Sequence, residues 1–184
     1  MHKVRFSTTE PRCDRRHYLS EDDVRVVLSR LPCETWERLK AVHFNDRSDG
    51  VRTLGYVTRG HREISICALP PKVSLTRFLR RRYRQTPGLF GAVRGRQWPV
   101  LAVRRFLLYD VFLHELGHIQ VVDPWQKDPR RRFAGDHLAQ EFVHRWRKTL
   151  WARRFDHPDP VHRRPSREEL AALAEEPRKE DARP

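Results

Sequence analysis

The longest apolar stretch of the chain runs from Phe106 to Val122 and keeps a helical pattern throughout. Its first eight residues, Phe106 to Leu113, are hydrophobic on nearly every side when drawn as a helix. A helix that is apolar all round is typical of the centre of a domain rather than of its surface. The pattern therefore predicts a buried central helix against which the other elements pack.

An N-terminal helix is predicted to begin after Ser20, because Ser20 and Asp23 form a capping box ahead of apolar positions at helical spacing. It ends near Pro32, and a second short helix is predicted from Glu34 to Lys40. From there the apolar positions alternate with polar ones, which is the period of a strand. The alternation predicts three strands, at 41–44, 53–58 and 63–69. A further helix is expected at 74–83.

The central helix carries the motif His114-Glu115-Leu116-Gly117-His118. Residues four apart return to the same helix face at about 100° per residue, so both imidazoles can face one ion. Glu115 lies beside that face. A zinc ion held by two His and one more protein ligand keeps a position for water, and the adjacent carboxylate can accept the proton of that water. The motif therefore predicts a zinc site with its own general base.

This motif resembles the active-site helix of the zincin metallopeptidases, and the Gly at its fourth place is common in compact branches such as SprT-like and ImmA/IrrE-type proteins. The resemblance implies that His114 and His118 bind Zn²⁺ and that Glu115 is the catalytic base. It also implies an α+β, minimal zincin-like fold, in which a small twisted sheet of about three strands packs against the motif helix and further helices.

The third zinc ligand requires a separate argument. The metzincin pattern is excluded because its Gly and third-ligand positions hold Val121 and Pro124. In gluzincin-type proteins an acidic residue on a second helix supplies the ligand, and the segment after Gly135 offers Asp136 or Glu141. On a helical wheel Asp136 lies about 60° from the centre of the apolar stripe, whereas Glu141 lies about 160° away. Asp136 is therefore the predicted ligand, with Glu141 as the alternative.

The resemblance also implies that an edge strand of the sheet lines the cleft and pairs with extended substrate. The strand at Ile64 to Leu69 is the candidate for that edge, and the alternative is an ordinary core strand. A donor that stabilises the oxyanion of the transition state is also expected. The sequence does not choose between Tyr109, Tyr56 and Arg94.

Charge adds a second function class to these expectations. The chain has 38 Lys and Arg against 24 Asp and Glu, a formal net charge of +14, which favours anionic partners such as nucleic acid. Nearly all of the basic residues are Arg rather than Lys, as a G+C-rich genome also places at exposed positions, so a merely basic surface is the alternative. The densest cluster is a candidate phosphate-binding surface, made of Arg77, Arg80, Arg81, Arg82 and Arg84.

Domain boundaries follow from composition. Residues 1–18 are polar and Arg-rich and are interpreted as a flexible arm, 19–152 as the zincin-like domain, and 153–184 as a Pro-rich, charged tail. The capping box Ser166 to Glu169 predicts a short helix within that tail. With no apolar run of membrane-spanning length and no signal-peptide pattern, a cytoplasmic location is expected, with no membrane partner. The three cysteines, widely spaced and odd in number, are expected to be reduced thiols.

The leading hypothesis from these observations is a cytoplasmic, zinc-dependent metalloendopeptidase acting on a protein or peptide. Two alternatives remain. The first is a basic nucleic-acid-binding or regulatory module with a non-catalytic zinc, and the second is a protease that acts on DNA-bound proteins.

Overall fold

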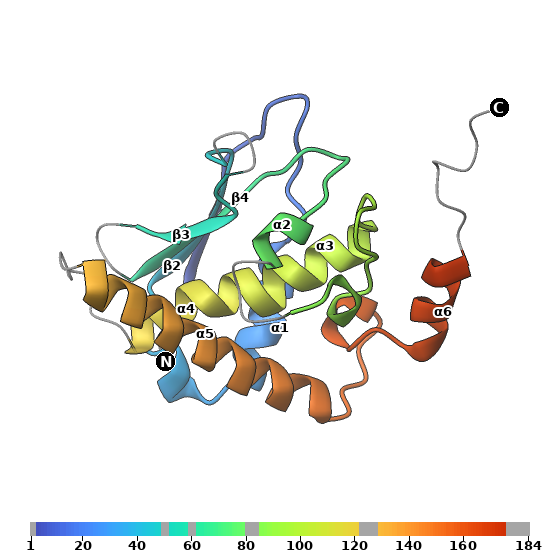
Figure 1. Ribbon diagram of the computed structural model, residues 1–184. Helices are drawn as coiled ribbons and strands as arrows, with labels where there is room; N and C mark the ends of the chain where they lie inside the picture. The colour runs from blue at the N-terminus through green and yellow to red at the C-terminus, as the bar shows by residue number, and fades with distance from the viewer. Residues whose placement is uncertain (1–2, 49–51, 59–61, 80–84, 122–128, 176–184) are drawn as a thin grey trace.

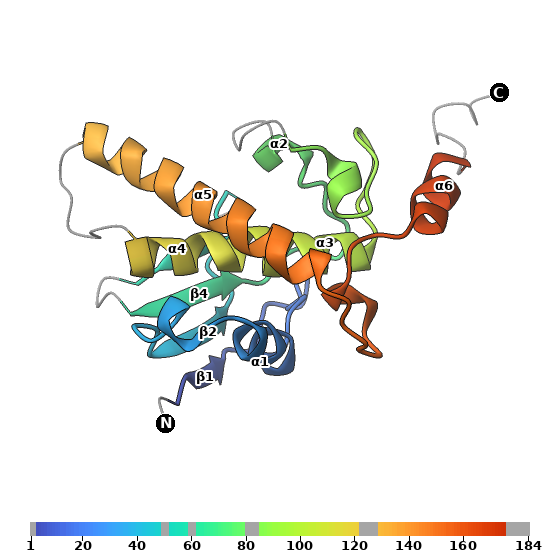
Figure 2. The ribbon, with the colours of Figure 1, turned by 90° about the horizontal axis from the view of Figure 1, so that it is seen from below.

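The computed structural model describes residues 3–48, 52–58, 62–79, 85–121 and 129–175 (Figure 1). It has an α+β fold in which one long helix runs through the middle of the molecule. A four-stranded sheet lies on one side of this helix, and a second long helix crosses it on the other side (Figure 2). The α+β class predicted from the sequence is confirmed.

The sheet contains β1 (Arg5–Thr8), β2 (Ala41–Asn45), β4 (Glu63–Cys67) and β3 (Gly55–Val57) in that spatial order. β1, β2 and β4 are parallel, whereas β3 is antiparallel to β4. Two expectations are corrected here. The sheet has one strand more than expected, and residues 5–8, assigned to a flexible arm, form its first strand.

The position of β4 corrects another expectation. The strand beginning at Ile64 was the candidate edge of the sheet, but β4 pairs with β2 on one side and β3 on the other. Ile64 and Ile66 are fully buried, as residues of a central strand should be. Of the strands described, β3 is the edge that contacts the central helix.

The N-terminal helix α1 (Glu21–Arg30) begins as predicted, because the Ser20 hydroxyl accepts from the Asp23 backbone N–H and the Asp23 carboxylate accepts in return from the Ser20 backbone. The second predicted helix is wrong in type and length. Only a single 3-10 turn, η1 (Cys33–Thr35), forms there. Leu39 is nevertheless fully buried in the core, as expected.

The central helix is continuous and begins six residues earlier than predicted. It comprises α3 (Val100–Phe106), a π-helical segment η3 (Leu107–Phe112) and α4 (Leu113–Val121). Every residue of η3 is fully buried. A π segment widens the turn and shifts the faces of the residues that follow it, and such segments are frequent next to functional sites. The motif residues lie on α4, directly after this shift.

The remaining helices enclose the central one. α5 (Pro129–Ala152) packs along α4, and the short α2 (Thr76–Leu79) and the 3-10 turn η2 (Pro87–Leu89) lie on the way into α3. The 3-10 turn η4 (Pro160–His162) and α6 (Arg167–Glu175) follow α5.

The chain after α5 is not a detached tail. Val161 is fully buried in the hydrophobic core, and Arg105 of α3 forms an ion pair with Glu169 of α6. Val4, N-terminal to β1, belongs to the same core. The predicted domain limits of 19–152 are therefore too narrow at both ends. The predicted cap of α6 is confirmed, because the Ser166 hydroxyl accepts from the backbone N–H of Glu169.

Candidate metal centre

Three of the predicted site residues converge between α4 and the first half of α5. The Nε2 atoms of His114 and His118 are 3.1 Å apart. Oδ1 of Asp136 lies 3.2 Å from Nε2 of His118 and 3.8 Å from Nε2 of His114. These are the only three His, Cys, Asp or Glu side chains in the described ranges that form a group able to hold a metal ion. We call them the metal centre.

The separations within the metal centre fit a zinc ion. Ligand atoms at the corners of a tetrahedron lie about 3.3 Å apart when each is 2.0–2.1 Å from zinc. The three measured separations, from 3.1 to 3.8 Å, surround that value. Two neutral imidazoles and one carboxylate also form the donor set that zinc shares with other borderline metal ions. The residues therefore fit the group that the motif implies.

The three side chains of the metal centre differ in how deeply they are buried. The side chain of His114 is 8% exposed, that of His118 22% and that of Asp136 62%. Nδ1 of His114 is buried and has no hydrogen-bond partner in the described part of the chain. A neutral imidazole carries its proton on only one of its two nitrogens. Whether Nε2 of His114 binds a metal ion or keeps the proton therefore determines the tautomer of this ring. The centre is thus closed on the helix side and open at Asp136.

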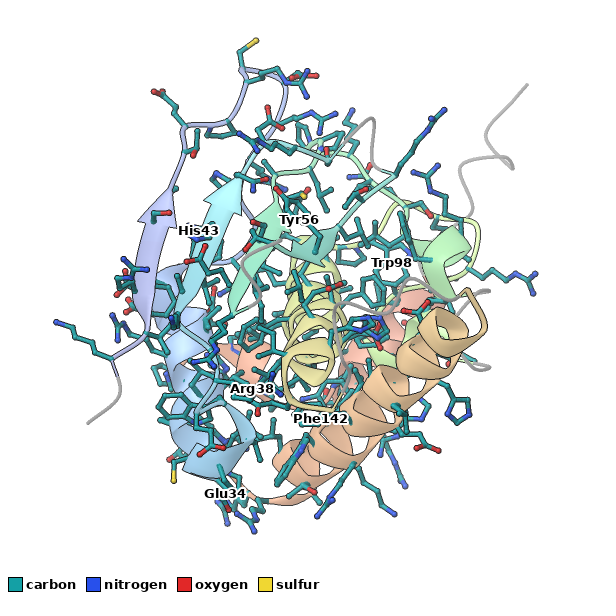
Figure 3. All side chains as sticks on the ribbon, turned by 90° about the vertical axis from the view of Figure 1, so that its left-hand side faces the viewer. Glu34, Arg38, His43, Tyr56, Trp98 and Phe142 are labelled. Carbon is teal, nitrogen blue, oxygen red and sulfur yellow. The ribbon has the colours of Figure 1, made fainter. Side chains whose placement is uncertain are left out.

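Glu115, on α4, is buried. Burial, and after it the charge of Glu115, raises the pKa of the Cys67 thiol at the end of β4 to about 11. The carboxylate of Glu115 is therefore near the end of β4. In Figure 3 this helix lies between the strands and α5, with Tyr56 labelled on the sheet side and Phe142 on the α5 side.

A second buried polar group lies along the same helix pair. Asp110, on η3 and fully buried, accepts at Oδ1 from Arg147 at 2.8 Å, from Gln85 at 3.0 Å and from Gln140 at 3.4 Å. His144 contacts Gln85, and burial together with the charge of Arg147 lowers the pKa of His144. We call these five residues the Asp110 network. The sequence argument missed it, and the only local signal is a carboxylate inside an apolar helix.

The other predicted residues lie elsewhere. Glu141 pairs with His137 on the exposed face of α5, away from the metal centre. The Tyr109 hydroxyl contacts Nδ1 of His162, whereas the Tyr56 hydroxyl accepts from the Asn45 amide. Arg94 is exposed in the loop before α3. None of these three oxyanion candidates is placed at the metal centre by a contact in the described ranges.

The basic cluster is described only at its first residue. Arg77, on α2, stacks over the ring of Phe78 at 5.0 Å. Arg80, Arg81, Arg82 and Arg84 lie outside the described residues. The predicted phosphate-binding surface therefore stays a prediction.

Two further observations concern the whole chain. No helix among the described residues combines the length and the apolarity required to cross a bilayer. Comparison of the chain with protein-family models, with curated proteins and with solved structures found no match.

Proposed function

We propose that this protein is a zinc-dependent metallopeptidase. The observation that carries the proposal is the convergence of His114, His118 and Asp136, with Glu115 buried next to them on the same helix. Two of these residues are one helical turn apart, but the third comes from α5, so the grouping is not a consequence of the motif alone. The resemblance of the motif to the zincins supports the same conclusion.

Each residue has a specific role in this proposal. His114 and His118 would bind zinc through Nε2, and Asp136 through a carboxylate oxygen. When bound, zinc supplies Lewis acidity that lowers the pKa of its water and polarises a substrate carbonyl. Glu115 would accept the proton of that water and pass it to the leaving amine. Its burial keeps the carboxylate out of bulk solvent, where the strength of this interaction would be reduced.

The position of β3 supports a path for the substrate. An edge strand leaves one row of backbone N–H and C=O groups available to an extended peptide. β3 is such an edge and contacts α4, the helix that carries Glu115. The peptide would therefore lie along Gly55–Val57 rather than along β4. A cytoplasmic setting is part of this proposal, because Cys13, Cys33 and Cys67 are free thiols.

The test separates catalysis from metal binding. Zinc content is measured for the purified wild type, and turnover is measured on a mixed peptide library read by mass spectrometry. Glu115→Gln should keep one zinc per chain and lose turnover, since it removes the base but no ligand. The matched control, Glu141→Gln, changes the same chemical group on the exposed face of α5 and should keep both.

The alternative function would give a different pattern. In a basic nucleic-acid-binding module with a non-catalytic zinc, wild type would bind zinc without cleaving any peptide, and Glu115→Gln would change little. Binding to DNA that weakens steeply with salt would then support that function. Absence of zinc in wild type after loading would contradict both.

A further inference from the structure

Gly117, the fourth residue of the motif, lies where α4 crosses α5. A Cβ atom placed on Gly117 would lie 3.0 Å from Cα of Ala139, 3.1 Å from its carbonyl oxygen and 3.2 Å from Cβ of Phe142. Two of these atoms are backbone atoms and the third is fixed to the backbone, so none can rotate away. A side chain at Gly117 would therefore require the two helices to move apart by a few tenths of an ångström.

This crossing is one helical turn from the third ligand. Asp136 precedes Ala139 by three residues, about 4.5 Å along α5, and lies close to the same face. Its carboxylate has a single methylene between it and Cα, and Oδ1 lies 3.2 Å from Nε2 of His118. The distance between Asp136 and the two imidazoles is therefore set by how closely the helices approach at Gly117.

The central helix is packed tightly against the sheet on the side away from α5. A Cβ on Gly55 of β3 would lie 2.8 Å from Cγ1 of Val111, one turn before Glu115, and 3.1 Å from the carbonyl oxygen of Ser65. The helix is thus in direct contact with the backbone of the sheet on its other side. In contrast, Glu141 and Arg145 on the outer face of α5 are exposed. Any added volume at Gly117 would therefore displace α5.

We propose that Gly117 is a positioning residue for the metal centre: its missing side chain lets α5 approach closely enough for an aspartate, rather than a longer glutamate, to serve as the third ligand. The inference rests on the proposed zinc site. It accounts for an Asp at a place where the gluzincin pattern has Glu. It also gives Gly117 a function in a helix interior, where alanine would be the more stable residue.

The first test is the zinc affinity of Gly117→Ala, measured by competition with a chromophoric chelator. Moving α5 outward should weaken zinc binding about tenfold or more, the usual effect of disturbing the support of a ligand. Gly88→Ala is the matched control. Its nearest atom is the Thr86 hydroxyl at 4.0 Å, and its affinity should equal that of wild type.

The second test asks whether a longer side chain at position 136 compensates for the wider separation of the helices in Gly117→Ala. Asp136→Glu alone should weaken zinc binding, because the longer side chain does not fit the native separation. Combined with Gly117→Ala, it should bind zinc more tightly than Gly117→Ala does, since the added methylene spans the wider gap. This non-additive recovery is not expected from a merely destabilised helix.

The outcomes separate the two proposals. Absence of zinc in wild type would reject the zinc site itself. Zinc in wild type with unchanged affinity in Gly117→Ala would reject only the positioning role. If Gly117→Ala does not fold, Asp136→Glu decides, because Asp136 is exposed and its replacement leaves the core intact. An affinity of Asp136→Glu equal to or above that of wild type would then overturn the inference.

Discussion

The metal centre and the Asp110 network both lie between the central helix and α5, the network with Gln85 added from a third segment, but they differ in how their polar atoms are matched. In the Asp110 network one buried carboxylate oxygen accepts from three N–H donors. In the metal centre two imidazole nitrogens and a carboxylate oxygen face one another, and each of these atoms can offer an electron pair. The two groups are separated by one turn of the central helix, from Asp110 to His114.

The difference favours a structural role for the Asp110 network and supports the proposed zinc site at the metal centre. Asp110 and Arg147 satisfy each other in the interior and make the packing of the helices specific, although Oε1 of Gln140 is buried without a hydrogen-bond partner among the described residues. Electron-pair donors that converge need a cation or a shared proton to be stable. The sequence motif identifies the metal centre. Only the contacts in the structure show that its polar atoms are matched differently from those of the Asp110 network. Each prediction below changes one side of this comparison.

The largest effect is expected when the ion pair between Asp110 and Arg147 is broken. Asp110→Ala removes the anion that pairs with Arg147, whose side chain is only 7% exposed. A buried charge left without its partner costs about 3–5 kcal/mol of unfolding free energy. Urea unfolding in the presence of a chelator, so that zinc does not contribute, measures this loss. Asp156→Ala, at an exposed aspartate, is the control and should change the unfolding free energy little.

A double variant tests whether the pair, rather than the site, is responsible. Asp110→Ala combined with Arg147→Met removes both charges and should recover part of the lost stability. A loss of unfolding free energy below about 1 kcal/mol in Asp110→Ala would show that Arg147 reaches solvent in that variant. Its charge would then not be left buried without a partner.

The metal centre should behave in the opposite way. Zinc in about hundredfold excess over its dissociation constant should raise the unfolding free energy of wild type by about 2.7 kcal/mol. His114→Ala should abolish this increase, because it removes one of the three ligands, whatever the loss of a buried side chain does to the metal-free protein. His137→Ala, at a half-exposed histidine on α5, is the control and should keep the full increase. An equal increase in His114→Ala would place zinc elsewhere.

The sequence predicted those features that depend on neighbouring residues. Both capping boxes and the strands β2, β3 and β4 were found because each is encoded within a few positions. β1 was missed, since Arg5–Thr8 has one apolar residue and is held in place by pairing with β2, more than thirty residues away. The central position of β4 also depends on which strands pair, and alternation alone does not specify the order of strands.

The same distinction applies to the candidate site. His114 and His118 face one another because helix geometry fixes residues four apart, so their grouping was predictable. Asp136 was chosen from its angle on a helical wheel, and the structure brings it to the two imidazoles. The Asp110 network depends on the register between η3, α5 and Gln85, three segments distant in sequence. Local patterns carry no information about that register.

A second buried histidine, His162, lies outside both groups and makes stability depend on pH. His162 contacts the Tyr109 hydroxyl and lies 3.9 Å from Asp23, and burial lowers its pKa from 6.5 to about 4. Its neutral form is therefore favoured in the folded state, while the unfolded chain takes up a proton below pH 6.5. Stability is present above that pH and is lost as the pH falls towards 4.

The measurement is the unfolding free energy of the metal-free protein at pH 7 and pH 5. Wild type should lose about 1–2 kcal/mol more than His162→Gln over this interval, because glutamine does not titrate. His17, which lies outside both polar groups and contacts the Thr9 carbonyl, provides the control variant His17→Gln. Equal losses in wild type and His162→Gln would mean that the ring protonates in the folded protein as readily as in the unfolded chain.

The smallest expected effect decides between the two carboxylates that the sequence left open. Glu141 is 63% exposed, nearly the same as Asp136 at 62%, so exposure does not distinguish them. Their partners do, because Asp136 contacts the imidazoles of α4 whereas Glu141 contacts His137 on its own helix. Glu141→Ala should therefore leave zinc affinity unchanged, while Asp136→Ala should lower it clearly. A loss in Glu141→Ala would mean that α5 rotates to present its outer face, and the close approach of Ala139 to Gly117 excludes such a rotation without separating the helices.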